Sequence, residues 1–369
     1  MKRFIAVIAL ISAAAFMCRA QEPERVEGYK YVDAATLPLY GKVNDHTSAR
    51  YERLPESLHG QIREQLWDLG RNSAGLYIRF RSNSSNIRAR WTSLNGFGMN
   101  HMTDTGVRGL DLYCIHDGEW RFMGSGRPVR GRKVTDARIV GHMEPEMREY
   151  MLYLSLYDGI TELEIGVDED AVIEAPEVNR PVCGEPVVMY GTSILQGGCV
   201  SRPGMVHTSI ISRKLDREVI NLGFSGNARL DPEIAEWMAQ TENPALFVLD
   251  FAPNSSPEII NEKGEAFFRI LRDAHPDVPV IFIEEPFFPH HIFDMEMNAE
   301  IVGKIEALQV LFGKLLDAGE KNIYYVPSDD MIGDDGEATV DGTHFTDLGM
   351  ERYVEVVLPV IEKALAGKK

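Results

Sequence analysis

The second half of the chain alternates short, largely apolar runs with segments of helical pattern. The runs lie at residues 187–190, 219–224, 245–251, 278–286 and 323–327, and a closing helical pattern extends from about 346 to 365. A strand that is apolar on both faces needs cover on both faces, and parallel strands need long crossovers, which helices supply. The alternation predicts an α/β domain at residues 179–369 with a doubly wound, five-stranded parallel sheet.

The first half has a different pattern. Short strand-like runs alternate with turns across residues 29–178, among them an alternating run at 77–81 and an Asp-Gly turn at 117–118. Alternation gives each sheet one apolar and one wetted face, so residues 21–178 are predicted to form a β-sandwich. A Pro-rich stretch at 176–186 is typical of a linker, and a length of 369 residues favours two domains.

The chain begins with the pattern of a secretory signal peptide over residues 1–20. Lys2 and Arg3 precede an apolar run at 4–17, and small residues follow. Cleavage near residue 20 and a secreted or periplasmic protein are predicted. A retained anchor and lipidation of Cys18 are the alternatives, although Met17 is bulky where a lipoprotein site has a small residue. No later run reaches the roughly 20 apolar residues of a membrane span.

The acidic charge of the chain limits the kinds of molecule that it can be expected to bind. The formal net charge is −18, and loss of the three basic residues in the leader leaves the remainder more acidic. Such a surface repels phosphate backbones and anionic lipid, so nucleic acid is not an expected partner. A neutral substrate such as a glycan is easier to accommodate. The charge says nothing about oligomeric state.

Three cysteines remain after the leader, Cys114, Cys183 and Cys199. Their wide spacing is neither a disulfide framework nor a zinc-finger pattern. One bridge with a spare thiol and three buried thiols both fit the sequence. The neighbouring His290 and His291 do not change this view, because adjacent residues rarely point at one ion, and no metal is predicted.

Ligands of an open parallel sheet bind outside the carboxyl ends of its strands, which selects candidate residues before any motif is named. Ser193 stands in Gly-Thr-Ser at the end of the first predicted strand. A serine at a strand-to-helix turn exposes its hydroxyl and brings its own amide to a helix start, where an oxyanion is stabilised. Taken alone, such a serine is more often a structural turn residue.

Two later segments supply what a nucleophilic serine needs. Asp341 and His344, three residues apart, can provide an imidazole base together with the acceptor that orients it. Gly226 can offer an unobstructed backbone amide and Asn254 a side-chain amide, which with the Ser193 amide make three oxyanion donors. Each residue alone has a plain structural explanation. Their occurrence in this order at successive strand ends predicts a catalytic site.

The order and local context of these residues resemble the SGNH (GDSL-like) hydrolase superfamily, whose domain has a flavodoxin-like sheet. The resemblance implies Ser193 as nucleophile, Gly226 and Asn254 as oxyanion donors, His344 as base and Asp341 as its orienting partner. Two positions depart from the family pattern. Thr192 stands where many members have Asp, and no Asp follows Asn254.

A second resemblance covers the first half. Residues 109–113, Gly-Leu-Asp-Leu-Tyr, match a GxDLY signature that marks an N-terminal, jelly-roll-like sandwich in a subgroup of bacterial secreted esterases. Several members are grouped with carbohydrate esterases. The resemblance therefore implies a serine esterase that forms an acyl-enzyme and removes acetyl groups from plant polysaccharide of the xylan or xyloglucan type. This mechanism needs no metal and no cofactor.

The sequence also offers candidates for substrate contacts and is compatible with more than one function. Candidates for the substrate pocket are Thr192, Arg202, Glu284 and Glu285. The sandwich is interpreted either as a carbohydrate-binding module, with Trp67, Trp91 or Trp120 as a sugar platform, or as a packed domain in which these rings are core. The alternative functions are a lipase, thioesterase or acyltransferase on another ester, and a non-catalytic glycan-binding protein.

Overall fold

The computed structural model describes residues 25–367, so the predicted leader and Cys18 lie outside the described residues. The first half contains β1 (Tyr29–Asp33), β2 (Leu39–Tyr40), α1 (Glu64–Gly70), β3 (Tyr77–Ser82), β4 (Ile87–Ser93), α2 (Asp104–Arg108), β5 (Leu110–His116), β6 (Glu119–Gly126), β7 (Val134–Val140), β8 (Arg148–Tyr153), β9 (Ile160–Asp168) and β10 (Ile173–Glu174). The second half contains β11 (Val182–Gly191), α3 (Ser193–Gln196), α4 (His207–Leu215), β12 (Arg217–Gly223), α5 (Pro232–Met238), β13 (Leu246–Asp250), α6 (Pro257–Ala274), β14 (Val280–Ile283), α7 (Met295–Asp317), β15 (Ile323–Val326) and α8 (Asp347–Ala366).

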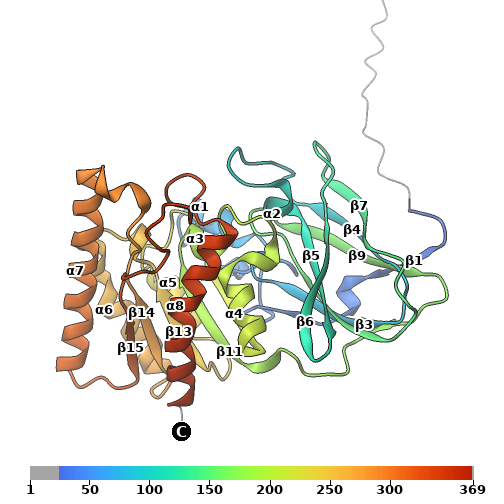
Figure 1. Ribbon diagram of the computed structural model, residues 1–369. Coiled ribbons are helices and arrows are strands. Elements are labelled where there is room, and N and C mark those ends of the chain that lie inside the picture. Colours follow the sequence, from blue (N-terminus) through green and yellow to red (C-terminus); the bar gives the residue numbers. More distant parts are fainter. Residues whose placement is uncertain (1–24, 368–369) are drawn as a thin grey trace, which may run out of the picture.

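The second half is the predicted doubly wound α/β domain. Its five strands are all parallel and follow the order β12-β11-β13-β14-β15. Side chains of β11 alternate between two cores, with Val187 and Met189 facing α4 and α8, and Val188 and Tyr190 facing α5 and α6. Figure 1 shows these helices on the two faces of the sheet. Burial on both faces explains why the strands are apolar throughout.

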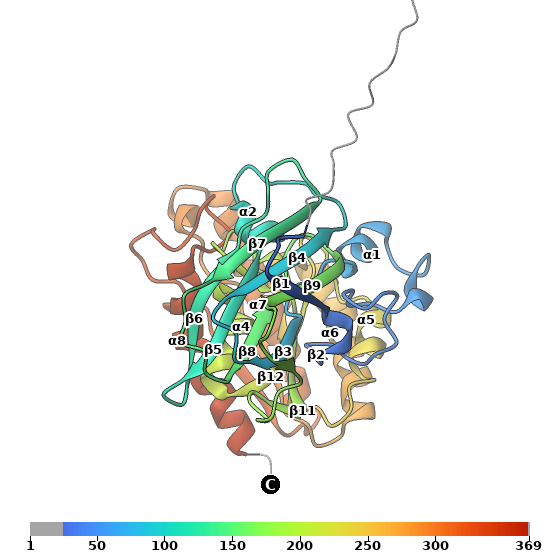
Figure 2. The same cartoon turned by 90° about the vertical axis from the view of Figure 1, so that its right-hand side faces the viewer.

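The first half is the predicted β-sandwich. One antiparallel sheet has the order β1-β9-β4-β7, and the other has the order β10-β3-β8-β5-β6 with β2 paired to β3. Figure 2 looks onto the strands of this half, with the helices of the α/β domain behind them. The strand β4 alternates buried and half-buried residues along its length, so the alternation in sequence reflects one face turned to the sandwich core.

The two halves meet in two shared hydrophobic clusters, and the sandwich has a core of its own besides. Leu54, Leu66 and Trp67, in and before α1, pack in one cluster with residues of β11, β12 and β13. The buried Arg53 donates hydrogen bonds to the carbonyls of Asn221 (3.2 Å) and Gly223 (2.8 Å) near the end of β12. A segment that the sequence assigns to the sandwich half therefore covers one face of the parallel sheet.

The positions of the tryptophans and cysteines decide two questions, whether the sandwich offers a tryptophan platform for a sugar and whether the cysteines form a disulfide. Trp67, Trp91 and Trp120 are all buried, with at most 9% of each residue exposed, so none offers a sugar platform on the surface. Cys114, Cys183 and Cys199 are free thiols, and Cys183 is only half-buried. Within residues 25–367, none of the helices has the length and apolar character required to cross a membrane.

Candidate active site

Ser193 lies at the carboxyl edge of the parallel sheet, where β11 ends. Thr192 caps α3, since its hydroxyl accepts a hydrogen bond from the Ile194 amide (3.3 Å), and Ser193 is the first helical residue. Gly223, at the end of the neighbouring β12, allows α3 to approach, because a β-carbon there would lie 2.2 Å from the Gln196 nitrogen. The short helix is thus held against the strand end, and Ser193 remains 7% exposed.

His344 and Asp341 reach Ser193 from the loop before α8. The Nε2 atom of His344 lies 2.9 Å from Ser193 Oγ, and its Nδ1 atom lies 2.7 Å from Asp341 Oδ2. The other carboxylate oxygen of Asp341 accepts the amides of His344 (2.8 Å) and Thr343 (3.1 Å). Ser193, His344 and Asp341 therefore form one hydrogen-bonded chain. These are the side chains that the sequence predicted as nucleophile, base and orienting acid.

The Asp341 carboxylate is held in its charged form. Partial burial opposes ionisation, but the hydrogen bonds from the amide and ring of His344 and the amide of Thr343 outweigh it and lower the pKa of Asp341 to about 2. A carboxylate in this position keeps the proton of His344 on Nδ1 and leaves Nε2 free to accept the proton of the Ser193 hydroxyl.

Gly226 and Asn254 follow the two strands that flank β11. Residues Gly223 of β12 and Asp250 of β13 both stand opposite Gly191 in the sheet. Gly226 has a positive φ of 68° and open space where a side chain would lie. The Asn254 side-chain oxygen accepts the Ala228 amide at 3.4 Å, which leaves its amino group as the end available to a ligand. Both residues stand at the same edge of the sheet as Ser193.

Comparisons with known proteins agree with this geometry. A family model described as the GDSL-like lipase/acylhydrolase family matches residues 184–362, and the GxDLY model, described as the N-terminus of SGNH-hydrolase-type esterases, matches residues 29–173. A solved structure described as a GDSL-like lipase from Bacteroides ovatus is 37% identical, with a TM-score of 0.87, and the match covers 92% of this chain and 98% of that one. The chain belongs to the GDSL-like lipase/acylhydrolase family.

More distant structures share the fold. A salicylyl-acyltransferase from a tetracycline biosynthetic pathway is 16% identical with a TM-score of 0.74, over 92% of this chain and 98% of the other. A family two carbohydrate esterase from Clostridium thermocellum, solved with cellohexaose, is 11% identical with a TM-score of 0.55, over 79% of this chain and 93% of the other. No significant match was found among curated proteins.

The GxDLY motif of this family member holds the loop that follows α3. Asp111 is fully buried and accepts hydrogen bonds from the Arg202 guanidinium (2.7 Å) and the Gly204 amide (2.8 Å). The Tyr113 hydroxyl accepts a second hydrogen bond from Arg202 at 2.8 Å. The Asp and Tyr of the motif thereby tie the sandwich to residues 202–204, nine or more positions beyond Ser193.

The same loop packs directly on the His344 ring. Gly198 lies so close to it that a β-carbon would meet His344 Cδ2 at 2.9 Å and the Tyr157 hydroxyl at 3.0 Å. Tyr157, from the sandwich half, donates a hydrogen bond to the Ser193 carbonyl at 3.1 Å. The loop after α3 is therefore shaped both by the sandwich and by the imidazole that it borders.

The four residues suggested for the substrate pocket all have hydrogen-bond or ion-pair partners within the protein. Thr192 is fully buried as the cap of α3, and Arg202 is held by the GxDLY motif. Glu284 accepts hydrogen bonds from Tyr325 (2.6 Å) and from the Ser328 amide (2.7 Å), and Glu285 pairs with the buried Lys304 at 3.2 Å. Strand ends bring side chains to the edge of a sheet, but burial decides which of them a ligand can reach.

Two residues near the site, His101 and Tyr157, were not predicted from the sequence. His101, in the loop before α2, has Nε2 at 4.0 Å from Asp341 Oδ2, and its ring centroid lies 5.7 Å from that of His344. Tyr157 lies in the turn after β8. Neither belongs to a periodic pattern, and both are distant in sequence from the residues they approach. The Asp-Gly pair after Tyr157 is the only local signal, and it indicates a turn rather than a site.

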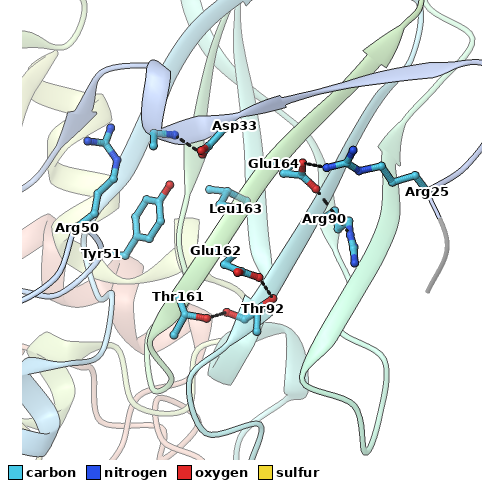
Figure 3. A pocket seen from close by; sticks show the side chains of 11 residues that line it. Arg25, Asp33, Arg50, Tyr51, Arg90, Thr92, Thr161, Glu162, Leu163 and Glu164 are labelled. Carbon is cyan, nitrogen blue, oxygen red and sulfur yellow. Dashed lines mark hydrogen bonds and ion pairs between the residues drawn. The ribbon is translucent and has the colours of Figure 1, made fainter. Parts of the chain in front are cut away.

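A hollow of about 750 Å³ lies on the sandwich, and Ser193 is not among its lining residues. Figure 3 shows Arg25 paired with Glu164, Thr92 hydrogen-bonded to Glu162, and Arg50 beside Tyr51. Arg25 and Arg90 both pair with Glu164, and the lining holds charges of both signs, so this hollow offers no clear selection for one charge of ligand.

Proposed function

We propose that this chain is a serine esterase that hydrolyses ester bonds through an acyl-enzyme and removes acetyl groups from a plant polysaccharide of the xylan or xyloglucan type. The observation that carries the proposal is the continuous hydrogen-bonded chain from Ser193 Oγ through His344 to Asp341, with contacts of 2.9 and 2.7 Å. These lengths are what proton transfer between a nucleophile and its base requires.

In the proposed mechanism, Ser193 Oγ attacks the ester carbonyl while its proton moves to His344 Nε2. The negative oxygen that develops is stabilised by the amides of Ser193 and Gly226 and by the amino group of Asn254. Collapse of this intermediate gives the acyl-enzyme, and His344 returns the proton to the departing alcohol. Water then attacks the acyl-enzyme with His344 again as base, and Asp341 stabilises the imidazolium in both steps.

The glycan part of the proposal is supported by three observations of different kind. The fold is shared with family two carbohydrate esterases, one of them solved with cellohexaose. The formal net charge of −18 disfavours phosphate-bearing partners. A leader with the pattern of a signal peptide supports a secreted or periplasmic protein, where such polysaccharide is met.

One feature favours a lipase or acyltransferase as the second candidate. Ile292, Phe293 and Met295 are 63%, 83% and 72% exposed. They lie in and just after the turn at residues 289–292, which packs on the loop that carries Asp341 and His344. In that turn, His290 lies 3.0 Å from where a β-carbon on Gly342 would be. An exposed apolar tip beside the site suits an acyl chain longer than acetate.

Acetate release from a panel of acetylated polysaccharides tests the proposal. We expect release from acetylated xylan or xyloglucan by the wild-type protein and none above background from Ser193→Ala, which keeps the fold because it only shortens one side chain. Nitrophenyl esters of increasing chain length separate the two candidates. Turnover that rises with chain length, together with no acetate release from any polysaccharide, would overturn the glycan assignment, and full activity of Ser193→Ala would overturn the serine mechanism.

A further inference from the structure

Four side chains with metal-binding atoms converge beside Ser193. These are His101, Cys199, Asp341 and His344, and one ligand atom from each lies within 4.8 Å of all the others. We propose that they form an inhibitory site for a divalent transition metal, with zinc as the best match, at the junction of the two halves. The site goes beyond the proposed function, because hydrolysis needs no metal.

The hydrogen bond of His101 leaves a ring nitrogen free for such an ion. Its Nδ1 atom lies 2.9 Å from the Asn100 side-chain oxygen, an acceptor, so the ring proton belongs on Nδ1. The Nε2 lone pair then faces Asp341 Oδ2 at 4.0 Å. In this tautomer His101 Nε2 has no proton to give Asp341 Oδ2, which already accepts from His344 Nδ1, whereas a cation between the two atoms would accept a lone pair from each. Metal-bound histidines usually carry this second hydrogen bond, which fixes the tautomer.

The set of ligands selects the kind of ion. A thiol, two imidazoles and one carboxylate suit zinc and similar transition metals, whereas calcium and magnesium prefer oxygen ligands. Bond lengths of about 2.0 to 2.3 Å to a tetrahedral ion place ligand atoms about 3.3 to 3.8 Å apart. With the ligand atoms within 4.8 Å of one another, the most distant pair would need to approach by at most about 1.0 to 1.5 Å, which is within the reach of side-chain rotation. The Cys199 thiol would release its proton to solvent on binding.

The framework around the cluster is held from both halves. The hydroxyls of Thr103 and Thr105, just after His101, each donate to the Ser201 carbonyl at 2.7 Å, two residues after Cys199. Asp347, three residues after His344, accepts the Ser201 amide at 2.9 Å. The backbones that carry three of the four ligands are thus tied to one residue, Ser201. Binding of an ion would therefore cost little conformational entropy in ordering these segments.

Occupation of this site would remove His344 and Asp341 from Ser193. If His344 binds the ion through Nε2, that atom can no longer accept the Ser193 proton; if it binds through Nδ1, the ring proton moves to Nε2, which again cannot accept. In either case the ion should block hydrolysis. This inhibitory consequence rests on the proposed function, whereas binding of the metal does not. The two are therefore measured separately.

Zinc binding to full-length Ser193→Ala protein, after treatment with a chelator, measures the site without turnover. We expect one zinc per chain by calorimetry, and a thiolate-to-metal charge-transfer absorbance when cobalt replaces zinc. Adding His101→Gln or Cys199→Ser should weaken zinc affinity by at least about 10-fold, and Cys199→Ser should abolish the cobalt band. The matched controls His116→Gln and Cys183→Ser alter residues outside the cluster and should bind as Ser193→Ala does.

Inhibition of nitrophenyl acetate hydrolysis by zinc measures the consequence, with each variant compared with its own zinc-free rate. The half-inhibitory zinc concentration should rise at least about 10-fold in His101→Gln and Cys199→Ser and stay unchanged in the two controls. Equal inhibition of all variants would mean that zinc acts on His344 alone and would overturn the four-ligand site. Absence of zinc binding by calorimetry would also overturn it, without bearing on the serine mechanism.

Discussion

Gly198 lies against the His344 imidazole, with room for no side chain between them. A β-carbon at Gly198 would meet His344 Cδ2 at 2.9 Å and the Ser193 carbonyl at 3.1 Å. We therefore expect Gly198→Ala to displace the ring and lower kcat by at least about 100-fold, because misplacement of about 1 Å can have that effect. Gly313→Ala, in α7 where nothing lies near the new methyl, is the control and should keep full activity. A fully active Gly198→Ala would show that His344 is not needed in its present position.

Asn254→Ala tests the oxyanion donors. Its amino group is the free end of the side chain, since the oxygen accepts the Ala228 amide. We expect kcat to fall about 100-fold to 1000-fold with little change in KM, because the lost hydrogen bond forms with the transition state rather than the substrate. Steady-state kinetics on nitrophenyl acetate measure both constants. A rise in KM at constant kcat would instead assign Asn254 to substrate binding.

Asp341→Asn tests how much of the contribution of Asp341 comes from its negative charge rather than from orienting the His344 ring. The Asp341 pKa of about 2 keeps the wild-type carboxylate charged at any pH where the protein is assayed. The amide removes the charge and can present a donor to Nδ1, which favours the wrong tautomer. Turnover should fall about 100-fold to 10,000-fold, but less than in Ser193→Ala. Loss as complete as in Ser193→Ala would make Asp341 indispensable rather than supporting.

Asp111→Asn tests the GxDLY clamp. The change leaves Arg202 without its buried carboxylate, and breaking such a pair costs about 3 kcal/mol at a position where Asp111 is fully buried. The free energy of unfolding from denaturant titration should fall by about that amount. Glu185→Gln, which breaks the exposed pair with Arg217, should cost less than about 1 kcal/mol. Equal effects of the two would show that Asp111 contributes no more than a surface charge.

Asp250→Asn should change how stability depends on pH. Burial, reinforced by the charge of Glu285 and opposed by the hydrogen bond from Tyr353, raises the pKa of Asp250 to about 7. Since this pKa lies above its unfolded value, the wild-type protein loses the associated stability as pH rises from about 4 through about 7. The variant has no such group, so its stability relative to wild type should improve by a few kcal/mol between pH 4 and 8. A constant difference across this range would contradict the raised pKa.

The parallel sheet and the order of the site residues were predictable because each follows from local pattern. Apolar runs separated by helices require a covered parallel sheet, and that sheet orders its strand ends along one edge. Ser193, Gly226, Asn254 and His344 are each read from their own strand end or loop. These four residues could be predicted without knowing any contact between segments that are distant in the sequence.

The remaining features depend on packing between the halves, which no local pattern encodes. Glu284 stands just after β14 and Arg202 in the loop after α3, and their partners Tyr325 and Asp111 come from other elements of the fold. His101 approaches Asp341 across more than two hundred residues of chain. Thr192 is now explained as the cap of α3, which accounts for its place beside Ser193.

Arg53 has a consequence for the order in which the chain is made. Its side chain is buried against carbonyls of β12, about 170 residues later in the sequence. The guanidinium also donates to the nearby carbonyls of Leu69 and Asn72. During synthesis, however, its Nη1 group and the apolar residues around it cannot be buried against β12 until that strand has been made. The segment around Arg53 therefore reaches its final packing only after β12 has left the ribosome, whereas the two antiparallel sheets pair and pack among residues 29–174 alone.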